Sequence, residues 1–123
     1  MKDHNYIKQR LKENLSDICV EHYETISSTN DYLLDKEFTS KYHLCYADAQ
    51  TKGRGRRQSN WISSVDTNIY STIGFKCDFG INQAPLVSIK TAVGVLEGIK
   101  EFVPDDLQKH LKIKLPNDIY FNG

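Results

Sequence analysis

The sequence Lys52-Gly53-Arg54-Gly55-Arg56-Arg57, followed by Trp61, is the most informative stretch of this chain. It places four cations within six residues and separates them with two glycines. The whole chain balances 16 Lys and Arg residues against 16 Asp and Glu residues, so the positive charge is concentrated here. Glycine permits close backbone approach, and arginine presents a planar fork of donors to carboxylate or phosphate oxygens. The stretch therefore predicts a loop, from Gln50 to about Asn60, that can fold over an anion.

Taken alone, this loop has plainer interpretations, namely a solvated surface loop or an Arg-Gly segment that binds RNA. A more specific interpretation is that its cations help a carboxylate attack a nucleotide phosphate. Two unit charges about 4 Å apart repel by roughly 4 kcal/mol at an effective dielectric constant near 20. Removing that repulsion is worth about three powers of ten in rate. Trp61 is then either a stacking platform for adenine or a partly buried anchor.

Length and composition limit the class of protein. A chain of 123 residues is one domain or part of one. No apolar run approaches the roughly 18 residues of a membrane span, and the polar start Met1-Lys2-Asp3-His4-Asn5 predicts no secretory signal. Cys19, Cys45 and Cys77 form no CxxC pair, which favours reduced thiols. We therefore expect a cytoplasmic protein with no membrane partner.

Hydrophobic periodicity predicts alternating helices and strands. Helices are expected over 2–15, from the Ser28 cap to about Glu37, and from Pro85 to about Val103. Strands are expected over 18–26, 43–49, 68–75 and 111–115, the last interrupted at 116–118 and resumed over 119–121. Asn122-Gly123 is a hairpin signal with no returning strand after it, so we expect the final strand to lack its partner.

Two short polar motifs accompany the cationic loop. Ser28-Thr29-Asn30 is a helix cap, and hydroxyl and N–H groups at a helix start also hold small polar ligands. Pro116-Asn117-Asp118 is a turn within a strand, or a pair of oxygen ligands for a nucleotide phosphate and its Mg²⁺. The sequence spacing of the histidines predicts no protein metal site; they are His4, His22, His43 and His110.

The order and spacing of these motifs resemble the catalytic domain of biotin protein ligases, over about residues 20–123. That family has a Ser-Thr-Asn at a helix start, a Gly-Arg-Gly-Arg followed by a Trp, and then a Lys-Trp-Pro-Asn-Asp. The counterparts here are Ser28-Thr29-Asn30, Gly53-Arg54-Gly55-Arg56-Arg57 with Trp61, and Lys114-Leu115-Pro116-Asn117-Asp118. The resemblance implies an α+β fold, a mixed sheet with packed helices like that of class II aminoacyl-tRNA synthetases and biotin–lipoate ligases.

The resemblance also implies an activity and a site. Members make biotinyl-5′-AMP from biotin and MgATP, release pyrophosphate, and transfer biotin to a lysine of a biotin carboxyl carrier domain, as in acetyl-CoA carboxylase. The implied biotin-binding residues are Ser28, Thr29, Asn30, Gln50, Gly53, Arg54 and Arg56. The implied nucleotide-binding residues are Arg56, Arg57, Trp61, Asn117 and Asp118, with Mg²⁺-ATP near the last two. The implied catalytic residues are Arg54, Arg56 and Arg57.

Several departures from the family pattern qualify the expected activity. Gln58 replaces a usual glycine, Ser59 stands where a basic residue is common, and Leu115 replaces the usual Trp. The family's catalytic lysine, the Gly-rich strand around it and a C-terminal barrel domain would all lie beyond residue 123. A winged-helix DNA-binding domain would have to precede the first strand, where only about 20 residues stand. We therefore expect a C-terminally truncated catalytic domain that is weak or inactive alone.

Other functions stay open beside biotin ligation. Lipoate or octanoate protein ligases share the fold, although the Arg-rich loop followed by Trp favours biotin. The chain is otherwise a non-catalytic remnant, or one half of a split ligase that a second, C-terminal chain completes. A nucleic-acid-binding module is disfavoured, because outside the single cationic loop the chain is acidic.

Overall fold

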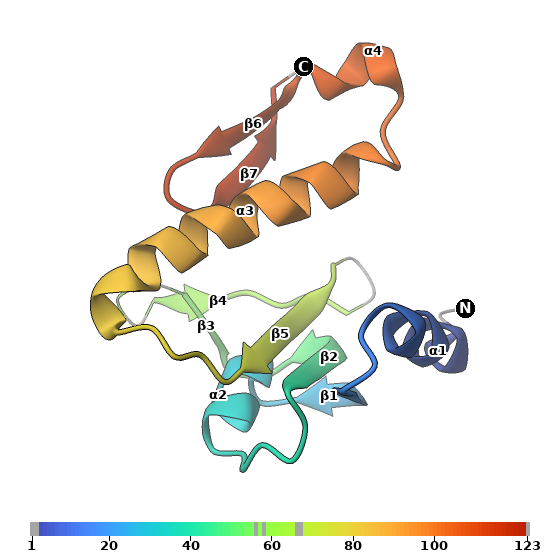
Figure 1. The fold of residues 1–123 in the computed structure, drawn as a ribbon. Coiled ribbons are helices and arrows are strands. Elements are labelled where there is room, and N and C mark those ends of the chain that lie inside the picture. The colour runs from blue at the N-terminus through green and yellow to red at the C-terminus, as the bar shows by residue number, and fades with distance from the viewer. Residues whose placement is uncertain (1–2, 56, 58, 66–67, 123) are drawn as a thin grey trace. The chain divides into compact units, whose positions relative to one another are not determined.

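In the computed structural model, residues 3–55, 57, 59–65 and 68–122 are described. The chain divides into two compact units, Met1–Cys77 and Asp78–Gly123 (Figure 1). The first unit contains the cationic loop and the Ser28 cap, and the second contains the Pro116-Asn117-Asp118 motif. Each unit is described by itself below.

The first unit is built on a three-stranded mixed sheet in the order β1-β2-β5 (Figure 1). Strand β1 (Ile18–Ile26) runs parallel to β2 (Tyr42–Gln50), and β5 (Tyr70–Phe75) runs antiparallel to β2. This arrangement confirms the α+β class and the mixed sheet expected from the sequence.

Alternation along the central strand β2 buries both of its faces. Even-numbered residues pack toward helix α1 (His4–Asn14), where Ile18, Val20 and Tyr46 form a core with apolar side chains of that helix. On the other face, His43, Cys45 and Ala47 are buried. Helix α2 (Thr29–Leu34) contacts β2 and β5. The sheet therefore holds the start of α2 close to the end of β2.

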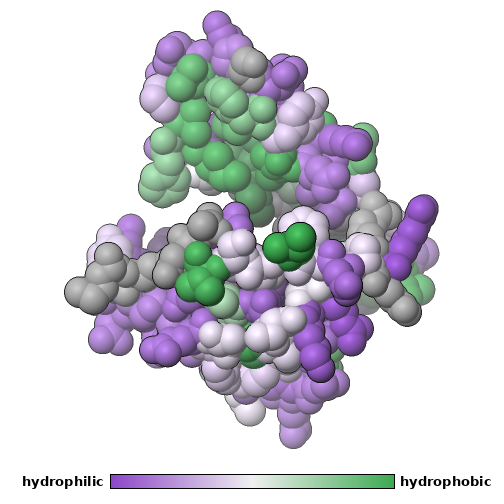
Figure 2. Space-filling model, turned by 180° about the vertical axis from the view of Figure 1, so that it is seen from behind, coloured by the Kyte–Doolittle hydropathy of each residue, from purple (hydrophilic) through white to green (hydrophobic). Residues whose placement is uncertain are grey.

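The second unit is a helix packed on a hairpin. Helix α3 (Ala84–Lys100) follows a 3₁₀ turn, η2 (Ile81–Gln83), and carries Pro85 in its first turn, as the sequence predicts. A short helix, α4 (Asp105–Gln108), leads to strands β6 (Leu111–Lys114) and β7 (Asp118–Phe121), both of which contact α3. Figure 2 shows apolar residues gathered over this unit. The exposed apolar residues of the unit include Leu86, Val95, Phe102, Leu115 and Phe121.

The hairpin corrects one expectation from the sequence. The segment 111–121 is not one interrupted strand, because β6 and β7 pair antiparallel, with Leu111 opposite Phe121 and Lys114 opposite Asp118. The chain reverses direction at the Pro116 turn, so the alternation on its two sides belongs to two strands. The final strand thus has a partner within the chain, and the expectation that it lacks one is wrong.

Candidate active site

Helix α2 begins at a capped serine. The backbone N–H of Asp31 donates to Ser28 Oγ at 3.3 Å, which confirms the predicted cap. Ser28 and Thr29 are both buried, whereas Asn30 is exposed. The cap thus directs two of the three motif residues inward.

A buried group of neutral polar side chains surrounds Thr29. Its backbone N–H donates to Gln50 Oε1 at 2.8 Å, and its hydroxyl lies 3.1 Å from the same oxygen. The hydroxyl also lies 2.9 Å from Thr72 Oγ1 on β5, and Gln50 Nε2 donates to Ser63 Oγ at 3.4 Å. Two strands, a loop residue and a helix start therefore bring hydroxyl and amide groups to one place.

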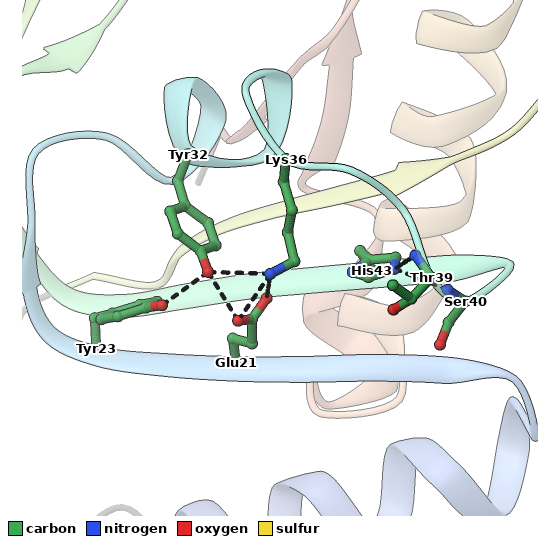
Figure 3. A network of polar contacts seen from close by, with 7 residues as sticks. All are labelled: Glu21, Tyr23, Tyr32, Lys36, Thr39, Ser40 and His43. Atoms are coloured by element: carbon green, nitrogen blue, oxygen red, sulfur yellow. Dashed lines mark hydrogen bonds and ion pairs between the residues drawn. The ribbon is translucent and has the colours of Figure 1, made fainter.

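A second polar network holds α2 against the sheet (Figure 3). Tyr23 donates to Tyr32, which donates to Glu21 Oε1 at 2.8 Å. Lys36 Nζ lies 3.2 Å from the same Glu21 oxygen and 3.1 Å from the other. The hydrogen bond to Tyr32 and burial raise the pKa of Tyr23 to about 12, and hydrogen bonds to Tyr32 and Glu21 raise the pKa of Lys36. The network fixes the helix whose start carries Ser28 and Thr29.

The cationic segment forms a small hairpin rather than an unstructured loop. Strand β3 (Gly53–Arg54) pairs antiparallel with β4 (Asn60–Trp61), and Gly55 N–H donates to Ser59 O at 2.8 Å. The start of the segment is tied to the turn before α2, because Lys52 N–H donates to Ser27 O. This pairing gives the predicted loop a defined base beside the start of α2.

Glycine is required at the base of this hairpin. A Cβ on Gly53 would lie 2.9 Å from Ser63 Oγ, 3.0 Å from Trp61 O and 3.2 Å from Gln50 Nε2. The backbone of β3 thus packs directly against Gln50, which belongs to the Thr29 group. The buried polar group and the hairpin are therefore parts of one site.

The hairpin borders an open pocket of about 630 Å³, lined by Thr51, Lys52, Gly53, Arg54, Ser59, Asn60 and Trp61. Trp61 is 61% exposed and lines this pocket, so it is not a buried core residue. Arg57 is exposed and has a positive φ of 55°. Arg56 and Gln58, which were predicted to belong to this loop, lie outside the described residues.

Arg54 is paired with a carboxylate. Its Nε lies 3.0 Å from Asp31 Oδ2 on α2, with the Arg54 side chain 63% exposed. Asp31 was not among the site residues predicted from the sequence, although it stands next to the Ser-Thr-Asn motif. Thr72, Ser63 and Lys52 were also missed. Lys52 lies within the quoted cationic segment, but Thr72 and Ser63 carry no local sequence signal.

Asn117 and Asp118 belong to the second unit. Asn117 lies in the turn between β6 and β7, and Asp118 begins β7; both side chains are exposed. Asn117 and Ile119 line a pocket of about 330 Å³ together with Ser88, Thr91, Ala92 and Val95 of α3. The structure therefore groups the predicted site residues as two sets, one in each unit.

Within the first unit the geometry suits a ligand with two chemically different ends. Buried hydroxyl and amide groups satisfy a neutral polar group that both donates and accepts hydrogen bonds. The hairpin's arginines and lysine suit an anion, and the exposed indole offers a flat apolar surface.

Known proteins resemble this chain over most of its length. Residues 23–123 match the biotin/lipoate A/B protein ligase family. The chain is 32% identical over 96 residues to the bifunctional ligase/repressor BirA of Escherichia coli, covering 77% of this chain and 29% of that protein. It is 33% identical over 96 residues to the biotin–protein ligase of Schizosaccharomyces pombe, covering 72% and 15%.

Solved structures give the same result for the fold. The biotin protein ligase of Aquifex aeolicus in complex with biotin and ATP matches with a TM-score of 0.58 and 29% identity, over 87% of this chain and 42% of that one. The enzyme of Leishmania major in complex with biotinyl-5-AMP matches with a TM-score of 0.69 and 22% identity, over 86% and 47%.

The fold and the family match define the class of this protein as that of the protein ligases named above. The chain belongs to the biotin/lipoate A/B protein ligase family. The Schizosaccharomyces pombe relative and the Aquifex aeolicus structure are biotin protein ligases, so the resemblance found in the sequence is confirmed. The chain spans less than a third of the length of these curated relatives. No helix among the described residues is long and apolar enough to cross a membrane.

Proposed function

We propose that this chain binds biotin and the adenylate in ATP-dependent biotin–protein ligation. In that reaction biotin and ATP give biotinyl-5′-AMP and pyrophosphate, and biotin then passes to a lysine of a biotin carboxyl carrier domain. The observation that carries the proposal is the contact of Gly53 with Gln50, which joins the buried polar group to the cationic hairpin. A single ligand can then contact both the buried polar group and the cationic hairpin.

The buried group is the proposed biotin end of the site. The ureido ring of biotin has two N–H donors and a carbonyl acceptor, all uncharged. Ser28, Thr29 and Gln50 offer hydrogen-bond donors and acceptors without introducing a buried charge. Asn30 is assigned here by the family pattern alone, since its side chain is exposed.

The hairpin is the proposed phosphate and adenine end. Arg54 and Arg57 carry charge that offsets the repulsion between the biotin carboxylate and the ATP phosphate, and the family pattern adds Arg56. Trp61 provides an exposed ring against which adenine can pack. We further propose that Asn117 and Asp118 supply oxygen atoms near the phosphates and their Mg²⁺, because Mg²⁺ prefers such ligands.

We propose a biotin carboxyl carrier domain as acceptor, a cytoplasmic location, no nucleic-acid partner, and a further polypeptide segment that completes the site. Alone, the chain is expected to bind ligand and turn over weakly or not at all. A lipoate or octanoate ligase is the alternative; the Schizosaccharomyces pombe relative and the Aquifex aeolicus structure, which are biotin protein ligases, favour biotin.

Calorimetric titration of the purified chain with biotin, lipoic acid, biotinyl-5′-AMP and lipoyl-5′-AMP tests the proposal. We expect biotinyl-5′-AMP to bind most tightly and both lipoyl ligands to bind more weakly. Pyrophosphate release with biotin and MgATP is measured in parallel. A folded chain that binds neither biotin nor its adenylate would refute the proposal, and turnover at ordinary ligase rates would refute the expected weak activity.

A further inference from the structure

Two histidines and an aspartate from three different elements come together in the first unit. They are His4 on α1, His22 on β1 and Asp48 on β2, and all three side chains are partly buried. One potential ligand atom from each lies within 4.8 Å of the other two. The three residues share no member with the Thr29 group or the β3–β4 hairpin.

Each imidazole already has a partner that orients it. His22 Nε2 lies 2.9 Å from Asp48 Oδ2, with the two side chains 13% and 17% exposed. His4 Nδ1 lies 3.1 Å from the hydroxyl of Tyr46, which leaves Nε2 as the ring nitrogen of His4 for another interaction. The His4 and His22 rings stack with their centroids 3.5 Å apart.

This donor set has the chemistry of a transition-metal site. Neutral imidazoles and one carboxylate are common ligands of Zn²⁺ and of similar divalent ions, with Zn–N and Zn–O distances of about 2.0–2.2 Å. An ion can replace the proton shared by His22 and Asp48 with little movement of either side chain. His4 must tilt out of the ring stack to aim its Nε2 at the same ion.

The tyrosine hydroxyl supports this reading. Metal-binding histidines usually use their second ring nitrogen in a hydrogen bond that fixes the tautomer and the ring orientation. Tyr46 occupies that position for His4, and it is itself held in the core with Ile18 and Val20. The proposed ligand on α1 is therefore anchored through a core residue.

We propose that His4, His22 and Asp48 bind one divalent transition-metal ion of the zinc type, which fastens helix α1 to the sheet. The site is structural and separate from the Mg²⁺-ATP chemistry of the proposed function.

Metal titration of the full chain tests this site with Zn²⁺ in competition with a chromophoric chelator, and with Co²⁺ by its visible absorption. A non-chelating reductant keeps the thiols reduced. We expect one equivalent to bind and the thermal unfolding midpoint to rise. An excess of Mg²⁺ should not compete, because Mg²⁺ prefers oxygen ligands.

Variants separate this site from adventitious binding. His4→Gln, His22→Gln and Asp48→Asn should each weaken Zn²⁺ binding at least about tenfold, and Tyr46→Phe by about tenfold through loss of the orienting hydrogen bond. His110→Gln and Cys77→Ser, which change side chains in other parts of the chain, should leave the affinity unchanged. Circular dichroism without metal verifies that each variant folds.

Three results would overturn the proposal. They are no binding of Zn²⁺ or Co²⁺, binding that is indifferent to His4→Gln and Asp48→Asn, or binding that Cys19→Ser or Cys77→Ser abolishes. Biotin titration of the same variants keeps this test apart from the proposed function. If the wild-type chain does not bind biotin, the proposed function fails, but the metal-binding result is unaffected.

Discussion

Arg54 Nε lies 3.0 Å from Asp31 Oδ2, so a cation proposed to meet the adenylate phosphate is already paired with a carboxylate of α2. The pair joins the hairpin to the helix that begins with Ser28 and Thr29. Ligand binding must then exchange one anionic partner of the guanidinium for another.

Removing either member of this pair should change adenylate affinity in opposite directions. Arg54→Ala should weaken biotinyl-5′-AMP binding by about 1.5–3 kcal/mol, roughly ten- to a hundredfold, the usual worth of a charge-assisted hydrogen bond. Asp31→Asn should strengthen binding by up to about fivefold, because an exposed ion pair is worth at most about 1 kcal/mol. Calorimetric titration measures both.

The double variant provides the control. In the Arg54→Ala background, Asp31→Asn should have little effect on adenylate affinity, because the arginine with which Asp31 competes is gone. If Asp31→Asn alone weakens binding instead, Asp31 serves to position Arg54 and does not compete for it.

Sequence patterns located most of the elements because their periodicities are local. The strand over 18–26, the Ser28 cap and the helix after Pro85 each leave a repeating or capping signal within a few residues. The hairpin of β6 and β7 was missed because alternation alone does not distinguish one interrupted strand from two paired ones. Whether one strand or two paired strands form depends on whether the chain reverses direction at Pro116. Hydrophobic periodicity carries no information on that reversal.

Part of the candidate site was also predicted, because some of its residues lie close together in the sequence. Motif residues such as Thr29 and Arg54 lie in contiguous runs, whereas Thr72 joins them only through the register that sets β5 beside β2. His4, His22 and Asp48 likewise meet through packing of α1 and the parallel pairing of β1 with β2. The spacing of the histidines excluded only metal motifs confined to a short stretch of sequence. His4 and His22 are 18 positions apart, and His22 and Asp48 are 26 positions apart, so such a motif does not contain them.

Thr29→Val should damage the biotin end of the site without unfolding the chain. The substitution keeps the shape of the side chain but removes the hydroxyl that lies near Gln50 Oε1 and Thr72 Oγ1. Because the Thr29 N–H still donates to Gln50, we expect a stability loss of about 1 kcal/mol. Biotin affinity should fall by at least tenfold in calorimetry. Thr25→Val, an exposed position on β1, is the matched control and should leave affinity unchanged.

Gly53→Ala should disturb the hairpin base, since the added Cβ meets Ser63 Oγ at 2.9 Å and Trp61 O at 3.0 Å. We expect a loss of about 1–3 kcal/mol in the free energy of unfolding and weaker adenylate binding. Gly98→Ala is the matched control, because no atom lies within 4 Å of a Cβ there and Gly98 is inside helix α3. That variant should gain about 0.8–1 kcal/mol from helix propensity. Equal effects of the two, measured by denaturant unfolding, would contradict the close contact at Gly53.

The network around Tyr23 should make the first unit sensitive to alkali. The hydrogen bond to Tyr32 and burial raise the pKa of Tyr23 to about 12, from about 10 in an unfolded chain. The folded state therefore holds this proton more tightly. Its contribution to stability is complete below about pH 10 and is lost as the pH rises toward 12. Lys36, whose pKa is also raised, acts in the same direction.

Tyr23→Phe should reduce the slope with which the free energy of unfolding falls between about pH 10 and 12, because one of the linked protons is removed. Denaturant unfolding at a series of pH values measures that slope. Tyr6→Phe, an exposed tyrosine of α1 outside the network, controls for the loss of a hydroxyl group. A Tyr23→Phe chain that loses stability as steeply as the wild type would show that the alkaline transition starts elsewhere. In that case the Glu21, Tyr32 and Lys36 contacts would be the next to remove.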